Sequence, residues 1–143
     1  MAINKTASEL IIKTNQELAL TTELYRKGVC SYDRLLCSYH LAEICEKLIK
    51  IQVHCKFNKT RRIKEDDLCT LVYLYVHNSN SKLNVWVPDF IGKCYTRISD
   101  WKKSFLKVPT RGITFMDIPD SDLQDVLNAC MGWYKKVLNM YLD

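Results

Sequence analysis

The chain has 143 residues, of which 48% are hydrophobic and 26% charged, and it contains only four Gly and three Pro. This composition excludes a disordered tail and favours helices over a strand-rich sandwich or barrel. The formal charge of +5 is mildly basic, well short of a dedicated nucleic-acid binder. We therefore expect one domain over 1–143, large enough to bury a substantial core.

The cysteines point to a reduced protein. There are seven, an odd number, and no two stand in CxxC spacing. Most fall on apolar helical positions, which indicates buried thiols in a cytoplasmic protein. The first residues lack the apolar core of a signal peptide, and no window approaches the ~18 apolar residues of a membrane helix. No sequence motif requires a metal or a cofactor.

Two helices are predicted in the first half of the chain, over 6–28 and 31–53. Gly28 is expected to end the first helix in a left-handed conformation, and the two-residue link predicts an antiparallel hairpin. The second segment has neither Gly nor Pro and carries one broad apolar stripe, which predicts the central helix of the fold. This stripe consists of Leu35, Leu36, Tyr39, Ala42, Cys45, Leu48 and Ile49.

Three further helices are predicted in the second half. Acidic residues open a helix over 65–77, Pro88 starts a helix over 88–101, and the last helix begins at 120. The stretch 103–119 holds two Pro and one Gly without a sustained apolar period, so a long loop is predicted there. The elements together predict an all-α fold, an antiparallel up-and-down helical bundle of about five helices.

A basic run is the first candidate for a binding surface. Between 47 and 64 lie seven Lys or Arg and no acidic residue. Such a run either holds phosphates or forms a solvated connector, and the pairs Glu43–Lys47 and Glu46–Lys50 have the spacing of ordinary surface ion pairs. The candidate ligand-binding residues are Glu46, Lys47, Lys50, Arg61, Arg62 and Lys64.

Other residues admit a functional and a structural reading. His40 is a candidate general base, although a His on the inner edge of a helix more often makes a structural hydrogen bond. Arg34 lies six residues before His40, so the two point to different faces of one helix. One aromatic set is read either as core plus rim or as a dimer face: Tyr73, Tyr75, Trp86, Tyr95, Trp101, Trp133 and Tyr134.

The run YHLAEICEKLIK at 39–50 resembles the central-helix signature of the HEPN family of prokaryotic helical-bundle domains. In that signature an aromatic residue, often His, is followed by Ala and then by Glu-Lys-Leu-Leu-Lys. The order of elements also agrees across essentially the whole chain, with Gly28 before the signature and Trp101 in a later helix. The residues that match in register are Ala42, Glu46, Lys47, Leu48 and Lys50.

The resemblance implies binding of a nucleotide or RNA, frequent homodimers, and pairing with a small nucleotidyltransferase. Some members are metal-independent ribonuclease toxins that carry Arg, four to six residues and then His near a late helix. The one formal match here, Arg34 to His40, lies in the central helix and is followed by Leu35, so the catalytic pair is not carried over. We therefore expect a non-catalytic nucleotide- or RNA-binding module, with an RNA-cleaving toxin and a structural dimer as alternatives.

Overall fold

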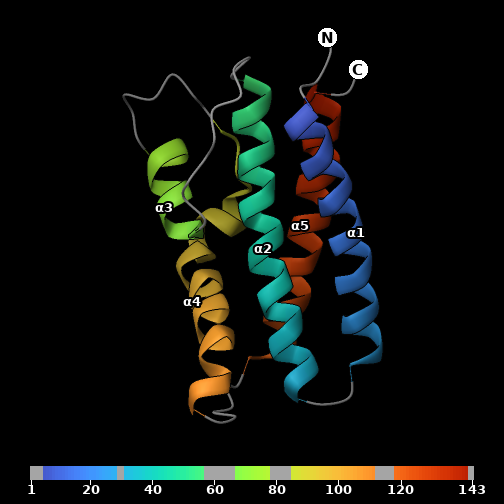
Figure 1. Ribbon diagram of the computed structural model, residues 1–143, viewed down its shortest axis with the longest axis vertical. Helices are drawn as coiled ribbons and strands as arrows, with labels where there is room; N and C mark the ends of the chain where they lie inside the picture. The colour runs from blue at the N-terminus through green and yellow to red at the C-terminus, as the bar shows by residue number, and fades with distance from the viewer. Residues whose placement is uncertain (1–4, 29–30, 57–66, 78–84, 112–117, 142–143) are drawn as a thin grey trace.

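The computed structural model describes residues 5–28, 31–56, 67–77, 85–111 and 118–141. Within these ranges the chain forms five α-helices and one π-helical turn, and the main helices alternate in direction (Figure 1). The predicted all-α antiparallel bundle is therefore confirmed. The elements are α1 (Lys5–Lys27), α2 (Ser31–Lys56), α3 (Leu68–Val72), η1 (Tyr73–His77), α4 (Asp89–Arg111) and α5 (Asp120–Tyr141).

Helix α2 is the centre of the bundle, and it contacts α1, α3, α4 and α5 (Figure 1). Its predicted apolar stripe is largely buried, but so are Leu41, Ile44 and Ile51, which lie outside that stripe. Apolar residues thus lie on more than one face of α2, which allows it to pack against helices on several sides. The short link to α1 produces the predicted antiparallel hairpin, in which Ala7 and Leu18 of α1 are buried.

The extended segment before α4 is held by a buried side chain of α2. Gln52 is fully buried, and its amide donates to the Trp86 carbonyl and accepts from the Trp86 N–H, both at 2.9 Å. The Gln52 amide thus replaces the strand partner that an extended backbone needs. The Pro88 carbonyl then accepts from the Gly92 N–H at 2.9 Å, so α4 starts directly after Pro88, as predicted.

The prediction of a loop over 103–119 was wrong for its first half, because α4 continues to Arg111, and residues 112–117 lie outside the described residues. Phe105 extends the apolar face of this helix by one turn beyond Trp101. Its ring packs on Tyr39 of α2, with the ring centroids 4.8 Å apart, and lies 6.1 Å from the ring of Tyr32. The tertiary contact with Tyr39 thus stabilises a helical turn that Phe105 also continues in the local apolar spacing.

The helix ends also differ in detail from the predictions. Gly28 does not adopt the left-handed conformation expected for it, but a Cβ atom there would lie 2.6 Å from the Leu24 carbonyl oxygen, which leaves no room for a larger residue. Asp67 is the N-cap of α3, since its side chain accepts from the Cys69 N–H at 2.9 Å. The predicted acidic start of this helix is thereby confirmed at Asp67, while Glu65 and Asp66 lie outside the described residues.

The described thiols are all free. Cys45 of α2 and Cys130 of α5 are buried with their sulfur atoms 3.6 Å apart, a contact without a covalent bond. The predicted reduced state therefore holds for the described cysteines, and Cys30 lies outside them. The free cysteines are Cys37, Cys45, Cys55, Cys69, Cys94 and Cys130.

The aromatic set mostly belongs to the core and its rim. Trp101 and Trp133 are buried, and four of the remaining five residues are half-buried. Only Tyr73 stands out, with 69% of its surface exposed. In the part of the chain that the structure describes, no helix combines the length and the apolar character needed to cross a membrane. The half-buried residues are Tyr75, Trp86, Tyr95 and Tyr134.

Candidate ligand-binding pocket

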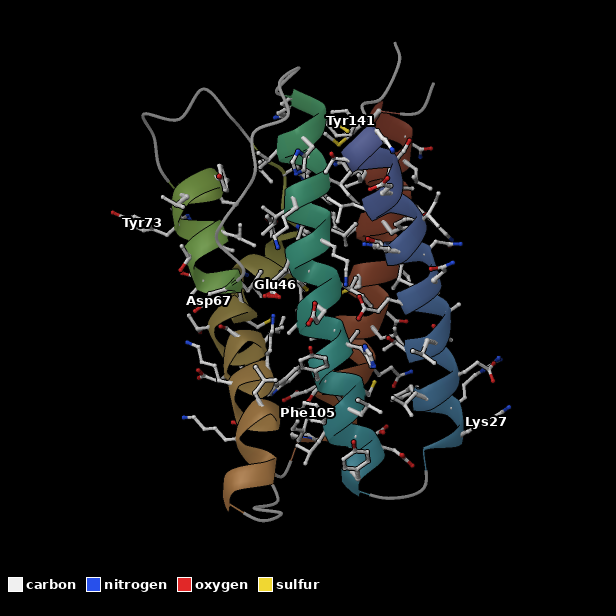
Figure 2. The ribbon with its side chains drawn as sticks, in the orientation of Figure 1. Lys27, Glu46, Asp67, Tyr73, Phe105 and Tyr141 are labelled. Atoms are coloured by element: carbon white, nitrogen blue, oxygen red, sulfur yellow. The ribbon has the colours of Figure 1, made fainter. Side chains whose placement is uncertain are left out.

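A pocket of about 290 Å³ lies where α2, α4 and the start of α3 meet. This volume is at the lower end of the range for small-molecule sites. Figure 2 places Glu46 and Asp67 on the side of α2 that faces α3 and α4. Apolar side chains form much of the wall, and charged groups from three parts of the chain converge on it. The lining residues are Ala42, Glu46, Asp67, Leu68, Ser99, Lys102, Lys103 and Leu106.

The deepest charged group of the pocket is the carboxyl of Glu46, a residue that is only 2% exposed. Lys102 Nζ of α4 lies 2.8 Å from each of its two oxygens and donates to both. Burial raises the pKa of Glu46 to about 7, and the nearby Glu43 acts in the same direction. The charges of Lys102 and Lys50 oppose this rise in pKa without cancelling it. Glu46 therefore changes its protonation state close to neutral pH.

Asp67 forms the second polar edge of the pocket, and unlike Glu46 it is held by several hydrogen bonds. Its Oδ1 accepts from the Cys69 N–H and from Ser99 Oγ, both at 2.9 Å, and its Oδ2 lies 3.5 Å from Lys103 Nζ. Burial alone would raise the pKa of Asp67, but these hydrogen bonds and the Lys103 charge outweigh burial and lower it. Asp67 thus stays ionised and fixes the start of α3 against α4.

A second set of charged groups continues from the pocket toward α1. Glu17 of α1 lies 2.8 Å from His40 Nδ1 and 2.6 Å from Lys47 Nζ. Lys47 also approaches Glu43 at 3.5 Å, which confirms the predicted i,i+4 pair. Glu43 in turn lies 3.7 Å from Lys102 Nζ. A continuous series of ion pairs therefore connects α1, α2 and α4.

Within this series Glu43 is kept ionised by its neighbours. Burial raises its pKa, but a 2.5 Å hydrogen bond from Tyr39 and the charges of Lys102 and Lys47 outweigh burial and lower it. The same hydrogen bond raises the pKa of Tyr39 to about 12, with burial as a second cause. Two carboxylates on adjacent turns of α2, Glu43 and Glu46, thus have their pKa values moved apart by their surroundings, a pattern typical of functional sites.

The predicted ligand-binding residues are only partly brought together. Glu46 lines the pocket, whereas Lys47 points to the Glu17 side of α2 and is not among the lining residues. Lys50 is half-buried and close enough for its charge to lower the pKa of Glu46. Lys50 is followed by the rest of the predicted set, Arg61, Arg62 and Lys64, which lies outside the described residues.

Sequence reasoning missed the residues that α3 and α4 contribute to the pocket, namely Asp67, Ser99, Lys102 and Lys103. One signal was available in the pattern of α4. Lys102 stands four residues after Ile98, on the face where an apolar residue is expected. A charged residue on the buried face of a helix requires a buried partner, here Glu46, but the sequence does not say which carboxyl it is.

The candidate catalytic pair is not brought together. Arg34 Nη2 lies 3.6 Å from Asp120 of α5, and His40 is bound to Glu17 of α1. Each side chain is thus held by a carboxylate on a different helix, and His40 makes the structural contact that was the alternative reading. In the described ranges, no three His, Cys, Asp or Glu side chains gather as metal ligands.

Comparison of the chain with protein-family models, with curated proteins and with solved structures gives no match. The likeness to the HEPN family therefore rests on the central-helix residues and the order of the elements, and it stays a prediction.

Proposed function

We propose that this chain is a non-catalytic nucleotide- or RNA-binding module whose ligand occupies the pocket between α2, α3 and α4. The observation that supports this most strongly is the buried Glu46–Lys102 pair at the wall of a cavity of about 290 Å³. A mostly apolar cavity with a few converging polar groups and a perturbed carboxyl is the usual form of a small-molecule site.

The pocket walls have the chemistry that a nucleotide needs. Leu106, which is 57% exposed, offers apolar surface to the face of a base, and Ala42 and Leu68 close the pocket behind it. Lys103 is 53% exposed by its side chain and its only described ion pair, with Asp67, is long at 3.5 Å, so it is available to a phosphate at the edge of the pocket. Glu46 supplies the acceptor oxygens that a base amino group binds, or a donor when it is protonated.

The alternative of an RNA-cleaving toxin is less well supported. A ribonuclease that uses Arg34 and His40 together requires both side chains to leave Asp120 and Glu17, or two copies of the chain to combine them. We also propose two protein partners, which the HEPN resemblance implies: a second copy of this chain and a small nucleotidyltransferase. Incubation of the purified protein with labelled RNA tests the toxin alternative, which requires cleavage that Arg34→Ala or His40→Ala abolishes.

Fluorescence anisotropy with a labelled short RNA at several salt concentrations tests the proposal. We expect Lys103→Ala to weaken binding and to flatten the salt dependence by about one unit of slope, as expected for one lost phosphate contact. The double variant Arg61→Ala/Arg62→Ala tests the basic run in the same assay. Lys135→Ala, an exposed lysine of α5, is the matched control. No binding by the wild-type protein contradicts the proposal.

A further inference from the structure

The buried ion pair in the pocket is built so that a ligand can exchange with one of its members. Glu46 is almost completely buried, whereas the side chain of Lys102 is 20% exposed and reaches the cavity from α4. Lys102 Nζ also lies 3.7 Å from Glu43, so it retains a negative neighbour if it leaves Glu46. Lys102 donates to both carboxylate oxygens of Glu46, so Glu46 loses both hydrogen bonds when Lys102 moves away.

The other charges around the pair determine what kind of ligand can enter. Asp67 is occupied by the α3 cap and by Ser99, so an amine that binds it competes with two short hydrogen bonds. The two lysines both line the cavity. The described contact of Lys103, with Asp67, is long at 3.5 Å, and Lys102 can exchange its 2.8 Å contacts with Glu46 because Glu43 lies 3.7 Å away. An anionic group is therefore favoured over a cationic one. The charged groups on the elements around Glu46 are Glu17, His40, Glu43, Lys47, Lys50, Asp67, Lys102 and Lys103.

We propose that the pocket binds the phosphate of a phosphate monoester on Lys102 and Lys103, and that this phosphate replaces Glu46 as the partner of Lys102 while Glu46 takes up a proton. The proton comes from solvent and binds a carboxylate oxygen of Glu46, and no covalent bond forms or breaks. The identity of the ester as a nucleotide rests on the proposed function, whereas the exchange at Lys102 rests on the pocket alone.

The physical reason for the coupling is the cost of an unpaired buried charge. A carboxylate that loses its partner in a site this buried is strongly disfavoured, and it neutralises instead. The pKa of Glu46 is already raised to about 7 with Lys102 in place, and loss of Lys102 removes an interaction that lowers it. Glu46 is therefore mostly ionised at pH 8 before binding and protonated after it, so uptake approaches one proton there and falls toward pH 6.

Isothermal titration calorimetry of the full chain at pH 8, in buffers of different ionisation enthalpy, measures this uptake directly. The probes are AMP and ribose 5-phosphate, whose phosphates are already dianionic at that pH. We expect close to one proton taken up per ligand and an affinity that falls up to tenfold from pH 8 to pH 9. In Glu46→Gln the uptake disappears and binding becomes independent of pH over this range. His40→Gln and Lys135→Gln are controls that retain the uptake.

The outcomes separate this inference from the proposed function. Binding of AMP without proton uptake, or uptake that survives in Glu46→Gln, overturns the exchange and leaves a nucleotide-binding module. Equal binding of ribose 5-phosphate and AMP, both with uptake, supports the exchange and counts against recognition of a base. If neither compound binds at millimolar concentration, the inference is overturned. Proton uptake by the wild-type protein tests the inference even if Glu46→Gln does not fold. Thermal unfolding followed by circular dichroism shows whether Glu46→Gln is folded.

Discussion

Lys102 Nζ lies 2.8 Å from both carboxylate oxygens of Glu46, and this contact joins the middle of α4 to the middle of α2. Taking two opposite charges out of water is costly, and their attraction repays the cost only with good geometry. Replacing both charged residues with apolar ones is therefore often harmless, whereas removing one partner leaves an uncompensated buried charge. The pair is expensive as a structural element alone, which is one reason to assign it to a binding site.

The first prediction concerns the removal of one partner. We expect Lys102→Met to destabilise the protein by roughly 2–4 kcal/mol at pH 8, because Glu46 is left buried without its partner and must take up a proton to avoid an unpaired buried charge. The double variant Lys102→Met/Glu46→Leu should recover most of this loss. Urea unfolding followed by circular dichroism measures both, with Lys103→Met as a half-exposed control that changes little. A double variant as unstable as the single one would contradict the argument.

The second prediction concerns pH. The folded pKa of Glu46, about 7, lies above the ordinary carboxyl value that it has in the unfolded chain. The folded state therefore binds the proton more tightly, and Glu46 reduces stability progressively as the pH rises from about 4.5 to 7. We expect the wild type to lose on the order of 3 kcal/mol relative to Glu46→Gln over this interval, with no further relative change above it. Unfolding of both proteins at pH 5, 6, 7 and 8 gives the difference, and a constant difference would be inconsistent with the raised pKa.

The third prediction concerns the segment that leads into α4. Gln52→Leu keeps the side-chain volume but removes both hydrogen bonds to the Trp86 backbone. Two backbone polar groups then lose their partners, so we expect a destabilisation of about 2–4 kcal/mol. Gln16→Leu, at an exposed position of α1, is the matched control and should change stability little. Equal effects of the two substitutions in urea unfolding would show that the buried amide does not hold this segment.

The sequence was sufficient to predict the bundle because periodicity and helix-start signals are local. The α1–α2 hairpin, the start of α4 after Pro88 and the start of α5 at Asp120 all follow from a few adjacent residues. The pocket was harder to predict from the sequence. Glu46 was identified, but its partner Lys102 lies 56 residues further along the chain. A helical period can show at most that both residues face inward. Whether they touch depends on how α2 and α4 pack together.

A similar limit explains the error at the end of α4. The helix was predicted to end near Trp101 because Pro109 and Gly112 follow, although Phe105 continues the apolar spacing of Ile98 and Trp101 by one turn. The contact of Phe105 with Tyr39 that holds this turn is tertiary. The Phe105 ring lies close to a residue 66 positions earlier in the chain. Packing of this kind overrides weak helix propensity, and it cannot be inferred from one segment alone.

The fourth prediction concerns two glycines inside helices. A Cβ atom added at Gly92 of α4 or at Gly132 of α5 meets no atom within 4 Å. Gly92→Ala and Gly132→Ala should each stabilise the protein by about 0.5–1 kcal/mol, because Ala loses less conformational freedom in a helix. Gly28→Ala is the contrasting variant and should destabilise, since its Cβ would lie 2.6 Å from the Leu24 carbonyl oxygen. Chemical unfolding measures all three, and a loss of stability in Gly92→Ala would contradict the open space at that position.

The central claim is that a nucleotide binds in the pocket between α2, α3 and α4, and a titration of ¹⁵N-labelled protein with AMP tests it most directly. We expect the backbone amide signals that shift most to belong to the pocket wall, at Ala42, Leu68, Ser99 and Leu106. Shifts confined to the basic run at 56–64, or no shifts at millimolar AMP, would contradict it.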